Sequence, residues 1–104
     1  MTGVKTMLDE KLGQVVISRS GRDKDRMYVV VQVVNDRFVM LVDGDLRKIE
    51  NPKLKNVKHI QFTGMKADDV IDYLARGEMP GNHIFRKNLK KLMENGERDG
   101  KEVW

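Results

Sequence analysis

Two runs of β-branched residues, separated by a short polar segment, constrain the fold of this chain most. The runs are Val15–Ser18 and Met27–Val34, and the segment between them spans Arg19–Arg26. Valine and isoleucine pack well on a pleated surface, so both runs predict strands and the pair predicts a β-hairpin. The second run is apolar at nearly every position, so both faces of its strand should be covered, as in a closed or sandwiched sheet.

Apolar runs and turn signals continue to alternate as far as Phe62. Asn35-Asp36 predicts a tight turn, because both residues tolerate positive φ. Along the second strand, Val29, Val31 and Val33 should share one face. The expected strands are Gln14–Ser18, Met27–Val34, Phe38–Val42, Leu46–Ile49 and Val57–Phe62. Five short strands with turns at these intervals favour a small β-barrel.

Beyond Gly64 the hydrophobic period becomes that of a helix. A period of 3.6 residues over Ala67–Ala75 predicts a helix that Gly77 should end. Asn82 predicts the N-cap of a second helix over 83–94, which Asn95-Gly96 should stop. The expected parts of the chain are an N-terminal segment with one helical turn (1–12), the barrel (13–62), a helical extension (63–96) and a disordered tail (97–104).

The composition excludes several kinds of chemical site. The 104 residues include no cysteine, which rules out disulfides, thiolate zinc sites and cysteine nucleophiles. His59 and His83 have no further ligand at metal-binding spacing, and Ser18 and Ser20 have no base at readable spacing. We therefore expect no catalytic, cofactor or metal site and no enzyme activity. Met1–Leu12 lacks the apolar run of a signal peptide, so we expect a cytoplasmic protein without a membrane partner.

Two groups of basic residues form the candidate binding site, in a chain whose net charge is +4. The first group lies in the hairpin loop and comprises Arg19, Gly21, Arg22, Lys24 and Arg26. The second group, opposed only by Glu50, comprises Arg47, Lys48, Lys53, Lys55 and Lys58. Each group also has a plainer interpretation. The loop cations could pair with Asp23 and Asp25, and the lysines could protect an edge strand from aggregation.

Aromatic residues and the second helix offer further RNA contacts, each with a plainer alternative. Tyr28, Phe38 and Phe62 could stack on bases, but they lie in apolar strands, so we expect them in the core. The second helix should likewise pack its apolar side chains on the core and leave its cations in water. The apolar set is Ile84, Phe85, Leu89, Leu92 and Met93, and the cations are Arg86, Lys87, Lys90 and Lys91.

The hairpin also carries a family-like pattern, which reads Gly13-x-Val15-Val16-x-Ser18-x-x-Gly21-Arg22-Asp23-x-x-Arg26. This pattern resembles the KOW motif. It is most similar to the form of the motif that occurs in one group of large-subunit ribosomal proteins of archaea and eukaryotes, and in small bacterial KOW-domain RNA-binding proteins. The resemblance continues through Phe38–Gly44 and Val57–Ile60 and covers about the first three fifths of the chain. The KOW pattern has a glycine where this chain has Asp25, which tolerates left-handed backbone at some cost.

The resemblance implies a mainly β protein with C-terminal α structure, namely a five-stranded SH3-like (KOW) barrel followed by two short helices. It also implies a ribonucleoprotein role in translation, in which the first hairpin loop contacts ribosomal RNA, with the large ribosomal subunit as the partner. We expect Asp23 to orient Arg22, because a carboxylate beside phosphate is repelled. The alternative is an SH3-like protein-interaction module in transcription or translation. That module would dock a partner on the Val/Tyr face of the second strand and the apolar stripe of the last helix.

Overall fold

The computed structural model describes the backbone of residues 10–103 and the side chains of residues 10–94. The strands are β1 (Gln14–Ser18), β2 (Met27–Val33), β3 (Phe38–Val42), β4 (Lys53–Asn56) and β5 (Ile60–Lys66). A single turn of 3-10 helix, η1 (Val57–His59), joins β4 to β5. Two helices follow, α2 (Asp68–Ala75) and α3 (Asn82–Val103). The protein is therefore mainly β with C-terminal α structure, as expected.

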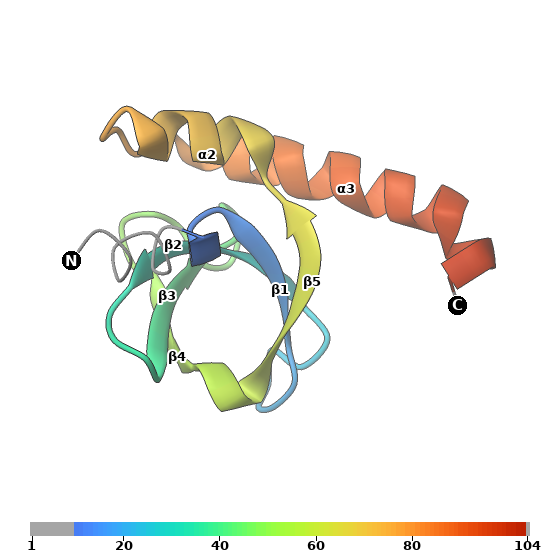
Figure 1. Ribbon diagram of the computed structural model, residues 1–104, viewed down its shortest axis with the longest axis horizontal. Coiled ribbons are helices and arrows are strands. Elements are labelled where there is room, and N and C mark those ends of the chain that lie inside the picture. The colour runs from blue at the N-terminus through green and yellow to red at the C-terminus, as the bar shows by residue number, and fades with distance from the viewer. Residues whose placement is uncertain (1–9, 104) are drawn as a thin grey trace.

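All five strands form one antiparallel sheet in the order β4-β3-β2-β1-β5. Neighbours in the chain pair along β1 to β4, whereas β5 returns to pair with β1. Figure 1 shows that the sheet curls strongly around its inner face and that α2 and α3 lie together over one side of it.

Apolar side chains cover both faces of the sheet. The outer cluster, between the sheet and the helices, comprises Val15, Val29, Val31, Val42, Ala67, Val70, Phe85 and Leu89. The inner cluster, inside the curl, comprises Val16, Tyr28, Val30, Val39, Leu41 and Ile60. Because β2 contributes to both clusters, the prediction that both of its faces are covered is confirmed.

A β-bulge in β2 changes which residues share a face. The register against β3 shifts between Val30 and Gln32, which leaves Val31 without an opposite residue. An extra residue reverses the alternation beyond it. Val33 therefore packs on the inner cluster, and the prediction that it shares a face with Val29 and Val31 is wrong.

The turn between β2 and β3 lies where it was predicted but forms differently. The Oδ1 of Asn35 accepts hydrogen bonds from the backbone N–H groups of Arg37 (2.8 Å) and Phe38 (2.9 Å). Within the described residues, Asp25 is the one non-glycine residue with positive φ, so Asn35 and Asp36 do not use that conformation. The asparagine side chain closes the turn instead.

The fourth strand was predicted in the wrong place. Leu46–Ile49 is a loop, because the Oδ1 of Asp43 accepts hydrogen bonds from the backbone N–H groups of Asp45 (2.9 Å) and Arg47 (2.8 Å). Side-chain bonds of this kind compete with strand pairing. The strand expected at 57–62 is also wrong at its start, where η1 forms, and at its end, since β5 continues further.

The helix α2 ends as predicted, before Gly77, whose φ is +75°. Its N-terminus is capped from α3 rather than by its own N-cap residue. The Oδ1 of Asn88, a buried residue, accepts hydrogen bonds from the backbone N–H groups of Asp69 (3.0 Å) and Val70 (3.3 Å). A cap donated by another helix satisfies the same unpaired N–H groups that a local cap would.

The helix α3 differs from the prediction at both ends. It begins at Asn82, and the Oδ1 of this residue accepts a hydrogen bond from the backbone N–H of Ile49 (2.8 Å). The stop predicted at Asn95-Gly96 is wrong, because α3 continues to Val103 through most of the expected disordered tail at 97–104. A glycine inside a helix costs only about 1 kcal/mol relative to alanine, so it need not end one.

The two ends of the described chain complete the fold. Glu10 and Lys11 are helical and are followed by Gly13 with a φ of +79°, as expected for a helical turn that Gly13 ends. The rest of that expected turn, Thr6–Asp9, lies outside the described residues, as does Trp104. Within the described residues, no helix has the length and apolar character that crossing a membrane requires.

Candidate nucleic-acid interface

The loop between β1 and β2 is closed by its own backbone. The N–H of Asp25 donates to the carbonyl of Ser18 at 2.8 Å, and the N–H of Arg26 donates to the carbonyl of Asp23 at 3.0 Å. Gly21 and Asp25 both have left-handed backbone, with φ of +82° and +73°. Asp25 thus takes the conformation for which the KOW pattern has a glycine.

Asp23 fastens this loop to β4. Its Oδ1 accepts a hydrogen bond from the Ser18 hydroxyl at 2.9 Å and lies 3.3 Å from the Nζ of Lys55. Its Oδ2 lies 3.6 Å from the Nζ of Lys53. The side chains of Asp23 and Lys55 are only 12% and 10% exposed, so water weakens this ion pair far less than a surface pair. Lys55 also donates to the carbonyl of Ser20 at 3.0 Å.

These contacts favour the ionised form of the Asp23 carboxyl group. Burial acts to raise the pKa of its carboxyl, but the Ser18 hydrogen bond and the charges of Lys55 and Lys53 outweigh burial and hold the pKa below its ordinary value. The prediction that Asp23 orients Arg22 is wrong, because β4 brings its lysines to the carboxylate. Among the described residues, Arg22 has no ion pair, and its side chain is exposed.

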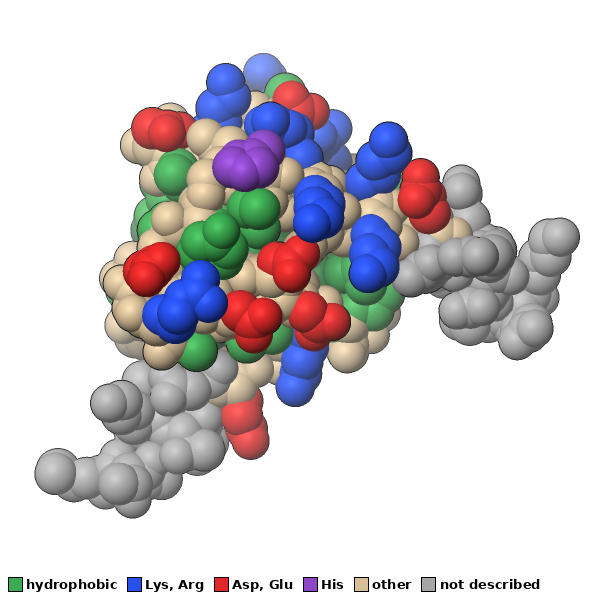
Figure 2. All heavy atoms as spheres, turned by 90° about the horizontal axis from the view of Figure 1, so that it is seen from above, with side chains coloured by type: hydrophobic (Ala, Val, Ile, Leu, Met, Phe, Trp, Pro, Cys, Tyr) green, Lys and Arg blue, Asp and Glu red, His purple; other side chains and the backbone are tan. Residues whose placement is uncertain are grey.

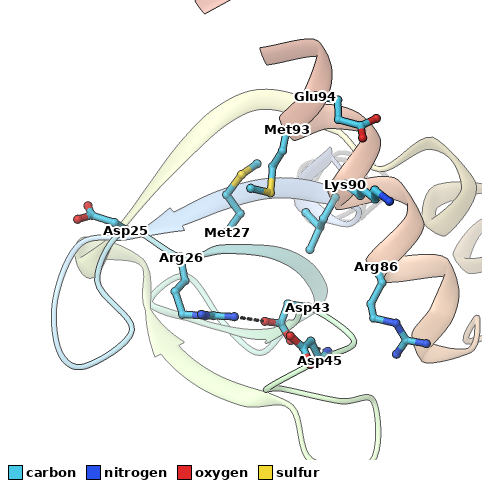
Figure 3. Close-up of a pocket in the computed structure, with 10 residues that line it drawn as sticks. Asp25, Arg26, Met27, Asp43, Asp45, Arg86, Lys90, Met93 and Glu94 are labelled. Carbon is cyan, nitrogen blue, oxygen red and sulfur yellow. Dashed lines mark hydrogen bonds and ion pairs between the residues drawn. The ribbon is translucent and has the colours of Figure 1, made fainter. Parts of the chain in front are cut away.

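Another carboxylate, that of the buried Asp43, joins the hairpin loop to the loop that follows β3. Its Oδ2 lies 3.3 Å from the Nη2 of Arg26, as Figure 3 shows. Its Oδ1 accepts the two backbone bonds already described, and the N–H groups of Asp43 and Gly44 both donate to the carbonyl of Arg47, at 2.9 and 3.0 Å. The Asp43–Arg47 loop is therefore closed on itself and tied to Arg26.

Three segments of the chain, held by these carboxylates, meet around one pocket of about 360 Å³. We call it the basic pocket. It is lined by Gly21, Arg22, Asp23, Arg26, Tyr28, Leu46, Arg47, Lys53 and Lys55. Five of these residues are cationic and one, Asp23, is acidic. Lys53 and Lys55 pair with Asp23 and Arg26 pairs with Asp43, whereas Arg22 and Arg47 have no ion pair among the described residues. The excess of positive charge in a concave site favours an anion such as phosphate.

The basic pocket unites part of each predicted group of basic residues. Gly21, Arg22 and Arg26 come from the first group, and Arg47, Lys53 and Lys55 from the second. The remaining predicted residues, Arg19, Lys24, Lys48 and Lys58, do not line it. The guanidinium of Arg19 instead donates to the Gln61 side-chain oxygen and lies 3.8 Å from the carboxylate of Asp25. This exposed pairing agrees with the plainer interpretation of a self-paired loop, and an RNA contact by Arg19 stays a prediction.

Three residues of the pocket were not predicted as site residues: Asp23, whose contacts are given above, Tyr28 and Leu46. Tyr28 lies in the inner cluster, as predicted, yet it also lines the pocket; burial, with the nearby carboxylates of Asp23 and Asp43, raises its pKa. Leu46 was assigned to a strand, but it lines the pocket with 65% of its surface exposed. No signal in the sequence marks Leu46 as a pocket residue, because its exposure depends on the loop that Asp43 closes.

A larger groove of about 600 Å³ lies between the base of the hairpin and α3 (Figure 3). Met27, Leu89 and Met93 give it an apolar part. Its charged residues are four acids, Asp25, Asp43, Asp45 and Glu94, and three cations, Arg26, Arg86 and Lys90. Because these charges nearly balance, this groove is a poorer site for an anion than the basic pocket.

The helices cover the sheet as predicted. Phe85 and Leu89 of α3 pack in the outer cluster, whereas Met93 is 54% exposed, contrary to its assignment to the apolar stripe. The cations of α3 are exposed, and Figure 2, which looks onto the helices, shows acidic and basic side chains interspersed there. One of them, Arg86, donates to the carbonyl of Gly44 at 2.6 Å and so ties α3 to the Asp43–Arg47 loop.

The chain matches no protein-family model, and no curated protein matches it at a significant level. Evidence for a function therefore comes from the basic pocket and from the resemblance of the hairpin to the KOW motif.

Proposed function

We propose that this chain is a non-catalytic RNA-binding protein that contacts structured RNA, above all ribosomal RNA, through the basic pocket. The observation that carries the proposal is the meeting of Arg22 and Arg26 with Arg47, Lys53 and Lys55 around one concavity. These residues come from three separate segments, so their convergence is a property of the fold. The resemblance of Gly13–Arg26 to the KOW motif supports the same ligand.

The mechanism we propose is electrostatic positioning of the RNA backbone. Phosphate contacts place an RNA on a protein without reading its sequence. Asp23 holds the hairpin loop to β4, and Asp43 holds Arg26 of the hairpin to the Asp43–Arg47 loop, before RNA arrives, so little further ordering is needed when it binds. A rigid cradle of this kind suits a shaped RNA better than an unstructured strand.

We further propose that the curled sheet is an SH3-like barrel of the KOW type. The support is the antiparallel order of the strands, with β5 returning to β1, and the inner cluster that fills the curl. On this basis the protein would act in the cytoplasm, in translation, on the large ribosomal subunit.

The alternative of a protein-docking module is weaker, because the surfaces it would use are covered. Tyr28 and Val30 lie in the inner cluster, and the apolar side chains Phe85 and Leu89 of α3 lie in the outer cluster. A docked protein would have to use the groove beside Met93 instead.

The test is to measure the affinity for a structured ribosomal RNA fragment and for a matched duplex DNA, each across a series of salt concentrations. We expect tighter binding to the RNA, with a salt slope that corresponds to about four phosphates or more. Weak and equal binding to both nucleic acids would overturn the proposal, and a protein partner should then be sought at the groove beside α3.

A further inference from the structure

Leu46 lines the basic pocket, but its apolar side chain has no part in binding a phosphate. Its side chain is 65% exposed, and it belongs to neither cluster of the core. It lines the pocket together with the adjacent cation Arg47. Single exposed apolar side chains are common on protein surfaces. Leu46 differs from the exposed Leu54 in that it lines the basic pocket, where a bound ligand would cover it and gain from removing its apolar surface from water.

The loop holds Leu46 in place. Beyond the bonds around Asp43, the loop is wedged against the start of α3. A Cβ added to Gly44 would lie 2.3 Å from the carbonyl oxygen of Asn82, and the Gly44 carbonyl accepts the 2.6 Å bond from Arg86. Leu46 is therefore carried on a braced loop, and its apolar surface is offered in a fixed position.

The pocket combines positive charge with an apolar lip, which matches the two chemical parts of a nucleotide. The phosphate is anionic, and the flat face of a base is apolar. Ligand pockets are usually about 300 to 1,000 Å³, so a volume of about 360 Å³ is suited to one small group. In a regular duplex the bases are stacked inside, whereas loops and bulges present unstacked bases to a protein.

We propose that the basic pocket takes one unpaired nucleotide of a structured RNA. The phosphate lies between Arg22 and Arg47, and the base lies against Leu46. This inference rests on the proposed function and deepens it, because it names the part of the RNA that enters the pocket. Leu46 is then a specificity-determining residue, while the cations supply most of the affinity.

The test compares two RNA hairpins that differ only in a single bulged nucleotide, each titrated at several salt concentrations. The proteins are the wild type, Leu46→Ala and the control Leu54→Ala. Leu54 is also exposed, at 55%, but lies on β4 and does not line the pocket. We expect the wild type to prefer the bulged hairpin by about tenfold, as covering part of a leucine would give. Leu46→Ala should lose the preference but keep the salt slope, and Leu54→Ala should behave as the wild type.

The remaining outcomes separate this inference from the proposed function. Equal binding to both hairpins with a steep salt slope would overturn the inference and leave RNA binding in place. Failure to bind either hairpin would overturn both. A preference that survives in Leu46→Ala, or that is lost equally in Leu54→Ala, would exclude Leu46 as the base contact. Thermal unfolding of each variant ensures that only folded proteins are compared.

Discussion

The guanidinium of Arg26 lies 3.3 Å from the carboxylate of Asp43, and this contact joins the two loops that form the basic pocket. Asp43 is buried, while Arg26 lines both the basic pocket and the groove beside α3. Because the Asp43 carboxylate is buried, its ion pair with Arg26 restrains the position of the Arg26 side chain in the pocket. The positions of the pocket cations thus depend on residues that an RNA would never touch.

Replacing Arg22 by glutamate should weaken RNA binding more than tenfold and lower the salt slope by about one phosphate, because an exposed pocket cation is lost. The control is Arg37→Glu, which makes the same charge change in the β2–β3 turn, outside the pocket. Both variants should melt at nearly the wild-type temperature. Unfolding of Arg22→Glu alone would mean that Arg22 is a structural residue.

Replacing Asp23 by asparagine should lower the free energy of unfolding at pH 7 by about 2 kcal/mol, since Lys55 loses a charged partner. The pKa of Asp23 is held below the ordinary value of about 3.9, so the unfolded state binds the proton more readily. The stability that Asp23 contributes is therefore present above about pH 4 and is lost as the pH falls below it.

Denaturant unfolding from pH 7 to pH 3 checks this prediction. The wild type should lose more stability over the acidic end of the range than Asp23→Asn does. Asp36→Asn, an exposed change in the β2–β3 turn, is the control and should follow the wild type. Parallel pH curves for the wild type and Asp23→Asn would contradict the assignment of the shift to Asp23.

Replacing Gly44 by alanine should cost about 3 kcal/mol or more of unfolding free energy, because backbone strain and a steric clash add. The new Cβ would meet the Asn82 carbonyl at 2.3 Å, and the φ of +79° is itself unfavourable for alanine. Gly77→Ala has a similar φ of +75° with nothing within 4 Å of its Cβ, so it should cost only about 1 to 2 kcal/mol. Equal losses in the two variants would show that α3 does not press on the Asp43–Arg47 loop.

Replacing Asp25 by glycine should raise the free energy of unfolding by about 0.5 to 1 kcal/mol. Its φ of +73° is costly for aspartate and free for glycine, although glycine loses more backbone entropy on folding. The Arg19 ion pair lost with it is exposed and contributes little. Chemical denaturation measures the change, and a loss of stability would mean that the Asp25 side chain supports the loop.

Elements that depend on local pattern could be predicted from the sequence. Alternation and β-branched residues located β1, β2 and β3, and the helical period located α2. The errors of prediction come from a side chain that binds backbone groups in one case and from a shift of strand register in the other. Asp43 turns Leu46–Ile49 into a loop, and the bulge at Val31 moves Val33 to the other face. The alternation of apolar residues, on which the strand predictions rested, is sensitive to neither of these features.

Some residues of the candidate site could be predicted from the sequence, and others could not. Charge, together with the KOW resemblance of the hairpin, selected the cations of the pocket, but it also selected Arg19, Lys24, Lys48 and Lys58, which do not line it. The partners of Asp23 could not be predicted, since Lys53 and Lys55 come from a strand that was itself misplaced. Leu46 was missed for the same reason, and its role depends on a loop that only the folded chain reveals.

The outer cluster is shared between the sheet and the helices, so α2 and α3 are part of the folded domain. Val15 and Val29 of the sheet are covered by Phe85 and Leu89 of α3. A fragment that ends after β5 would lack α2 and α3 and would expose the apolar side chains of the sheet that these helices cover. An exposed apolar face of this kind promotes aggregation. The smallest piece able to present the basic pocket must therefore keep α3, although α3 contributes no residue to that pocket.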